Sequence, residues 1–153
     1  MALAILGGAA TFSADQPLPP LGVCEVLRDL PANEGKTVAV VGRYSYRETG
    51  RWVDEQSCTP ALTVPLQLWI VEDPKTGPKP PENFELDGVV LKQKLTELQK
   101  RTPLGKFRFG SSEYDRWAVI YGRVEARKGD DAKKAAANLV IRGDGVIIKL
   151  TPE

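Results

Sequence analysis

Two segments of this chain carry the same unusual strand pattern. The runs 38–44 (Val-Ala-Val-Val-Gly-Arg-Tyr) and 119–124 (Val-Ile-Tyr-Gly-Arg-Val) are rich in β-branched and aromatic residues, and each contains Gly-Arg. A glycine inside a strand packs no side chain, so it marks a bend, a bulge or the close approach of another backbone. Two such strands predict a small, strongly curled β-barrel.

Hydrophobic alternation and turn residues place the remaining strands. We predict them at 51–54, 62–71 and 138–150. The last of these contains Gly143-Asp144-Gly145, which indicates either a bulge or a hairpin. On the first Gly-Arg strand, the side-chain alternation predicts an inward-facing set of Val38, Val40, Tyr44 and Tyr46.

Two helices complete the pattern. Apolar residues at 23, 26, 27 and 30 predict a short helix that Pro31 ends, and a second amphipathic stretch predicts a helix over about 88–100. The resulting order is strand, strand, strand, helix, strand, strand, which matches the five-stranded oligonucleotide/oligosaccharide-binding (OB) barrel. We therefore predict a mainly β protein: a five-stranded OB-fold-like barrel with an N-terminal short helix and a helix between strands 3 and 4.

Composition narrows the classes of function. The 153 residues include 21 Lys and Arg against 20 Asp and Glu, a net charge of +1, whereas a nucleic-acid binder normally shows a basic excess. Histidine, the commonest general base near neutral pH, is absent from the sequence. Two cysteines without histidine also fall short of a zinc ligand set. We expect no enzymatic activity, no cofactor and no metal site.

The N-terminus suggests export. Residues 1–14 carry no charge and read as the apolar and cleavage regions of a secretory signal peptide, although the basic start of such a peptide is missing. The alternative is a disordered leader. Residues 15–153 then form a single domain, and no segment is long enough to span a bilayer. We expect an exported protein, periplasmic or extracellular.

The expected state of the two cysteines, Cys24 and Cys58, depends on the cellular compartment. In an exported protein this even count predicts one disulfide, which would stabilise the fold by roughly 3 to 4 kcal/mol in the chain-entropy model. In the cytosol the same residues would be two buried thiols.

A sequence resemblance bears on the same question. The run Cys24-Glu25-Val26-Leu27, the Gly-Lys-x-Val-x-Val-x-Gly strand at 35–42 and the later Cys58 resemble a group of small exported bacterial OB-like proteins of unknown function. The resemblance covers mainly the first third of the chain. It implies the fold, export and a Cys24–Cys58 bond, and it brings no active site.

Ligands of OB barrels usually lie across strands two and three. That placement predicts a binding face of Arg51, Trp52, Gln67 and Trp69. Lys128, Lys133 and Lys134, in the loop between strands four and five, flank this face. The alternative is that both tryptophans are half-buried at the barrel rim. Arg43 and Arg123, which follow the two strand glycines, are expected to lie near one another. Either they bind one anion together or, as is commoner, each forms an ion pair with a neighbour such as Glu125.

These observations favour a non-catalytic binding module with an unknown protein or carbohydrate partner. The alternative is a single-stranded oligonucleotide-binding protein that stacks bases on Trp52 and Trp69.

Overall fold

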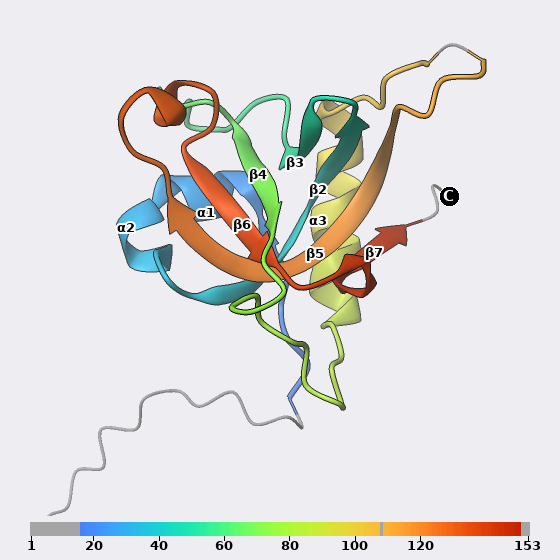
Figure 1. Cartoon of the computed structure of the whole chain (residues 1–153). Helices are drawn as coiled ribbons and strands as arrows, with labels where there is room; N and C mark the ends of the chain where they lie inside the picture. Colours follow the sequence, from blue (N-terminus) through green and yellow to red (C-terminus); the bar gives the residue numbers. More distant parts are fainter. Residues whose placement is uncertain (1–15, 108, 151–153) are drawn as a thin grey trace, which may run out of the picture.

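The computed structural model describes residues 16–107 and 109–150, so the predicted signal peptide at 1–14 lies outside the described residues. The described residues form one seven-stranded sheet with helices around it (Figure 1). The strands are β1 (Leu21–Gly22), β2 (Thr37–Arg47), β3 (Gly50–Asp54), β4 (Gln67–Glu72), β5 (Tyr114–Ala126), β6 (Ala137–Ile141) and β7 (Ile147–Leu150). The helices are α1 (Val23–Arg28), α2 (Leu30–Asn33) and α3 (Gly88–Arg101), with 3-10 turns η1 (Gly129–Lys133) and η2 (Asp144–Val146).

Five of the strands close into a barrel. Their order is β2, β3, β4, β6, β5, and β5 returns to pair with β2. Strands β4 and β6 are parallel, and the other barrel pairs are antiparallel. The helix α3 connects β4 to β5, which are the third and fourth barrel strands in sequence order (Figure 1). The predicted fold class, including the short N-terminal helix, is confirmed; β1 and β7 are additional outer strands.

The two Gly-Arg strands pair with each other along most of their length. They are β2 and β5, which run antiparallel from the pair Thr37–Arg123 to the pair Tyr46–Tyr114. A Cβ atom on Gly42 would lie 2.6 Å from Cγ2 of Val53, and one on Gly122 would lie 2.8 Å from the carbonyl oxygen of Val140. Both glycines therefore permit close packing inside the barrel, which is one of the three roles that the sequence left open.

The hydrophobic core has two parts. Inside the barrel, Val38, Val40 and Tyr44 of β2 pack with residues of every other barrel strand, as their alternation predicts. On the outer side of β2 and β5, a second cluster that includes Trp117 packs beneath Leu98 of α3. Tyr46 departs from the prediction, since it is 37% exposed although it faces the same side as Tyr44. It lies beyond the end of the packed core.

Two predicted boundaries were wrong. The strand expected at 62–71 begins only at Gln67, although Leu62 and Leu66 still pack against the core. The apolar spacing there reflects burial of a loop, and Pro65 lacks the N–H that a ladder needs. Pro31 does not end the first helix; α1 ends at Arg28, and Pro31 lies in the first turn of α2.

The break at Gly143–Gly145 is neither a hairpin nor a one-residue bulge. Strands β6 and β7 both pair antiparallel with β5, β6 at Arg123–Ala126 and β7 at Trp117–Ile120, so the two halves run in one direction. The 3-10 turn η2 separates them.

The cysteines form a disulfide, which confirms one of the two alternatives. Cys24 and Cys58 are bonded, with their Cα atoms 5.7 Å apart, and the bond joins α1 to the segment after β3. Beside it, the buried carboxylate of Glu55 accepts a hydrogen bond from the backbone N–H of Cys24 (2.8 Å) and one from Arg101 of α3 (2.6 Å). These contacts hold α1, the end of β3 and α3 together. No helix within residues 16–107 and 109–150 is long and apolar enough to cross a membrane.

Candidate binding face

A row of side chains crosses the outer surface of the barrel. The strand registers place these residues side by side on β2, β3, β4, β6 and β5, and we call the row the tryptophan face: Ser45, Trp52, Trp69, Asn138 and Glu125. The two indoles are directly opposite across β3 and β4, with ring centroids 5.3 Å apart and ring planes at 45°. Both are half-buried. The predicted juxtaposition of Trp52 and Trp69 is therefore present.

Local backbone geometry sets the position of Trp69. Gly50, with φ +146°, lies so close to this ring that a Cβ atom there would stand 2.3 Å from Cζ3. The indole Nε1 of Trp69 is buried and has no hydrogen-bond partner among the described residues. Trp69 thus presents apolar ring surface, and its polar N–H is not available to a ligand.

Arginines flank the two rings. The guanidinium carbon of Arg47 lies 5.6 Å from the centroid of Trp52, and that of Arg127 lies 5.7 Å from the centroid of Trp69. Each arginine has an acidic partner: Arg47 contacts Asp115 at 2.8 Å, and Arg127 contacts Asp131 at 3.7 Å. The positive charge near the indoles is therefore neutralised within the protein.

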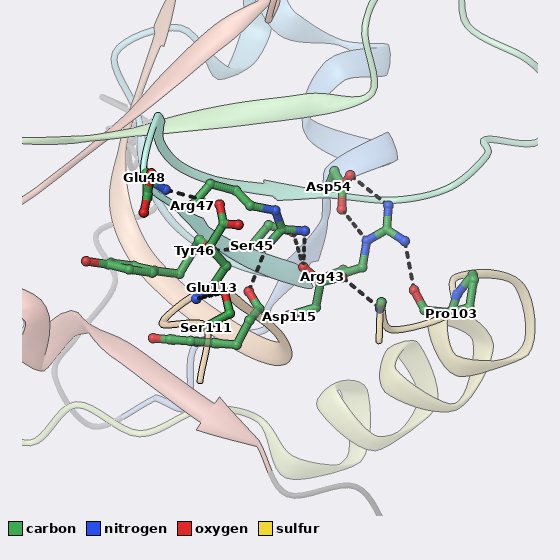
Figure 2. A network of polar contacts seen from close by, with 12 residues as sticks. Arg43, Ser45, Tyr46, Arg47, Glu48, Asp54, Pro103, Ser111, Glu113 and Asp115 are labelled. Carbon is green, nitrogen blue, oxygen red and sulfur yellow. Dashed lines mark hydrogen bonds and ion pairs between the residues drawn. The ribbon is translucent and has the colours of Figure 1, made fainter. Parts of the chain in front are cut away.

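Asp115 joins the polar groups at one end of this face (Figure 2). Its carboxylate accepts hydrogen bonds from the Ser45 hydroxyl, from Arg47 and from the backbone N–H of Gly105, each at 2.8 Å. Burial opposes ionisation of Asp115, but these bonds outweigh it and lower the pKa of the carboxyl group. Asp115 is therefore ionised at neutral pH and holds β2 to the start of β5.

Arg43 is also held by a carboxylate. It donates two hydrogen bonds to Asp54, at 2.8 and 2.9 Å, and a third to the carbonyl of Pro103 at 2.7 Å (Figure 2). The hydrogen bonding to Asp54 raises the pKa of Arg43. This geometry leaves Arg43 committed to structural contacts.

The predicted proximity of Arg43 and Arg123 was wrong. Arg43 is opposite Trp117 and Arg123 is opposite Thr37, six positions along the ladder, which corresponds to about 20 Å. The sequence predicted that their strands pair but did not reveal the register. Arg123 contacts Glu125 at 3.0 Å, as the alternative expectation had it, and also donates to the carbonyl of Thr76 at 2.6 Å.

The other predicted site residues divide between two sides of the sheet. Gln67 lies two residues before Trp69 on the same side of β4, and its side-chain amide donates to the carbonyl of Lys134. Arg51, by contrast, faces away from Trp52, because successive strand residues alternate. Its partner in the register is Tyr46, and its guanidinium contacts Asp144 at 2.7 Å.

A second group of aromatic and basic residues lies past the packed core, at the end of the barrel where Tyr46 is exposed. The sequence patterns did not predict this group. We call it the tyrosine end, and it consists of Tyr44, Tyr46, Arg51, Tyr114, Arg116 and Lys149. Tyr46 and Tyr114 are register partners whose rings stack, with centroids 5.4 Å apart and planes at 7°. The run 119–124 that predicts this strand does not extend back to Tyr114 or Arg116, where β5 begins.

Comparison with known proteins identifies no relative: no family model, no curated protein and no solved structure matches this chain. Within the described residues, no group of three or more Cys, Asp or Glu side chains is placed to hold a metal ion. The tryptophan face and the tyrosine end are therefore the features that bear on function.

Proposed function

We propose that this protein is an exported OB-fold domain, akin to the small bacterial proteins it resembles, that binds carbohydrate on the tryptophan face without catalysing a reaction. Two features support the fold and the location. The barrel's strand order, with a helix between its third and fourth strands, fits an OB fold. The disulfide fits an oxidising compartment outside the cytoplasm.

The charge balance of the tryptophan face carries the choice of ligand. All four arginines that approach it have acidic partners, namely Asp54, Asp115, Glu125 and Asp131. A protein that binds a phosphate backbone gains affinity from cations that are free to replace counterions. Paired arginines offer little of this gain, so a single-stranded oligonucleotide fits this face less well than an uncharged ligand.

An oligosaccharide fits both chemical parts of the face. Its apolar ring faces stack on the half-buried indoles of Trp52 and Trp69, which present ring surface. Its hydroxyl groups find hydrogen-bonding partners in Asn138 and Glu125, the next residues of the same row.

Fluorescence titration tests this proposal. Oligosaccharides selected on a glycan array should change the tryptophan emission of the full-length protein, and the Trp52→Ala variant should bind them about tenfold more weakly. Val89→Ala, which removes an exposed side chain on α3, is the matched control and should bind normally. Quenching by single-stranded DNA that weakens with added salt, with no response to any glycan, would reverse the assignment.

The export part has its own test. The gene is expressed with its native upstream region in a bacterial host, and intact mass is measured in periplasmic and cytosolic fractions. We expect a periplasmic species without the leader, lighter than the dithiol by the hydrogens lost on oxidation. A full-length cytosolic dithiol would contradict export.

A further inference from the structure

The tyrosine end differs from the tryptophan face in position and in charge. Its residues lie on the inward-facing side of β2, β3 and β5 and on the outer strand β7, past the packed core, where Tyr46 is 37% exposed. Figure 2 shows the Tyr46 side chain directed away from Arg47 and Asp115, so the two groups occupy opposite sides of the same strands.

Two cations approach the stacked rings. The Lys149 ammonium lies 5.0 Å from the centroid of Tyr114, and the Arg116 guanidinium carbon lies 5.9 Å from it. Both side chains are exposed. Within residues 16–107 and 109–150 neither forms a salt bridge. The third cation, Arg51, is paired with Asp144, whose carboxylate is 78% exposed.

The buried member of the group adds no opposing charge. Burial raises the pKa of Tyr44 to about 12, so its phenol stays neutral at physiological pH. The ring of Tyr44 lies 5.9 Å from that of Tyr114 and supports it from the core side. The tyrosine end therefore combines a firmly held aromatic platform with a net positive charge.

We propose that the tyrosine end is a second binding site, for a small ligand in which a planar ring carries an anionic group such as phosphate. The ring of the ligand packs against the exposed part of the stacked Tyr46–Tyr114 pair, beside which Lys149 and Arg116 lie. The anionic group is met by Lys149 and Arg116, which bind it as charge-assisted hydrogen-bond donors. This site shares no residue with the tryptophan face and does not depend on carbohydrate binding there.

Nuclear magnetic resonance titration of the full-length protein with 4-nitrophenyl phosphate tests the site. We expect shifts at the amides of Tyr46, Tyr114, Arg116 and Lys149, weakened by added salt. Two comparison ligands separate the contributions: 4-nitrophenyl glucoside keeps the ring without the charge, and inorganic phosphate keeps the charge without the ring. Each should bind at this end at least about tenfold more weakly.

Variants complete the test. Lys149→Gln should weaken binding of 4-nitrophenyl phosphate about tenfold, as should Arg116→Gln, and both side chains are exposed enough for the fold to persist. Lys92→Gln removes another exposed lysine charge, on α3, and should change nothing. The proposal is overturned if Lys149→Gln binds like Lys92→Gln, if the shifts map to Trp52 and Trp69, or if inorganic phosphate binds as well as the aryl phosphate.

Discussion

The tryptophan face and the tyrosine end share the strands β2, β3 and β5 and combine aromatic with basic side chains, yet they differ in charge. Each pairs two aromatic rings across neighbouring strands, and each brings cations close to those rings. At the tryptophan face the arginines are matched by carboxylates, whereas at the tyrosine end Lys149 and Arg116 are not matched within the described residues. Under the proposed functions, this difference in charge distinguishes an uncharged ligand at the tryptophan face from an anionic ligand at the tyrosine end.

The largest expected effect is on the stability of the barrel that carries both sites. Gly122→Ala places a Cβ atom 2.8 Å from the Val140 carbonyl oxygen, a backbone atom that cannot move without separating β5 from β6. We expect a loss of about 2 to 3 kcal/mol in the free energy of unfolding, measured with urea. Gly88→Ala, where the added atom meets nothing within 4 Å, is the control. Equal stability of the two variants would contradict the packing role of Gly122.

Asp115→Asn sharpens the comparison, because it makes the tryptophan face resemble the tyrosine end. Losing the carboxylate weakens the hydrogen bonds to Ser45, Arg47 and Gly105 and should cost about 1 to 2 kcal/mol of stability at pH 7. The freed Arg47 beside Trp52 should also produce weak, salt-sensitive binding of single-stranded DNA.

The cost of Asp115→Asn should depend on pH. The folded-state pKa of Asp115 lies below its ordinary value of 3.8, so its stabilisation is complete above 3.8 and is lost as the pH falls through the folded-state value. The stability difference from wild type should therefore shrink in acid. Asp130→Asn, at an exposed loop aspartate, is the control. A difference that stays constant from pH 7 to strong acid would show that the charge is irrelevant.

A smaller effect is expected from removing one ring at each site. Trp52→Ala should weaken oligosaccharide binding about tenfold and leave 4-nitrophenyl phosphate binding unchanged. Tyr46→Ser should do the reverse. Isothermal titration calorimetry on both variants with both ligands gives four affinities, and a variant that lost both ligands would mean that the sites are not separate.

The smallest expected effect comes from adding charge to the tyrosine end. Asp144→Asn frees Arg51 from its only carboxylate partner in the described part of the chain. Because that carboxylate is 78% exposed, its influence is screened by water, and binding of 4-nitrophenyl phosphate should strengthen only about threefold. Weaker binding in this variant would mean that Asp144 positions Arg51 for the ligand.

The sequence predicts features that depend on local pattern. Glycines inside β-rich runs mark the two strands that pair, and an apolar stripe followed by Thr102-Pro103 marks α3. The alternation along β2 correctly gives the side on which Tyr44 and Tyr46 lie. The alternation does not show at which residue along the strand the packed core ends. Tyr46 was therefore expected in the core, although it is exposed.

Features that depend on register are beyond a single sequence. The separation of Arg43 from Arg123 follows from which residues of β2 and β5 are opposite each other, and neither strand alone contains that information. The same holds for Arg47 and Asp115, which are distant in sequence and share a hydrogen bond across strands. Since these cross-strand ion pairs decide the charge of the tryptophan face, its ligand class could not be read from composition alone.

One titration tests the difference between the two sites most directly. The full-length protein, labelled with ¹⁵N, is titrated with an oligosaccharide from the array and with 4-nitrophenyl phosphate, each at low and high salt. We predict two separate sets of shifted amides, with salt-insensitive sugar binding around Trp52 and Trp69 and salt-sensitive phosphate binding around Tyr46 and Lys149. A single set of amides that responds to both ligands with the same salt dependence would contradict the account.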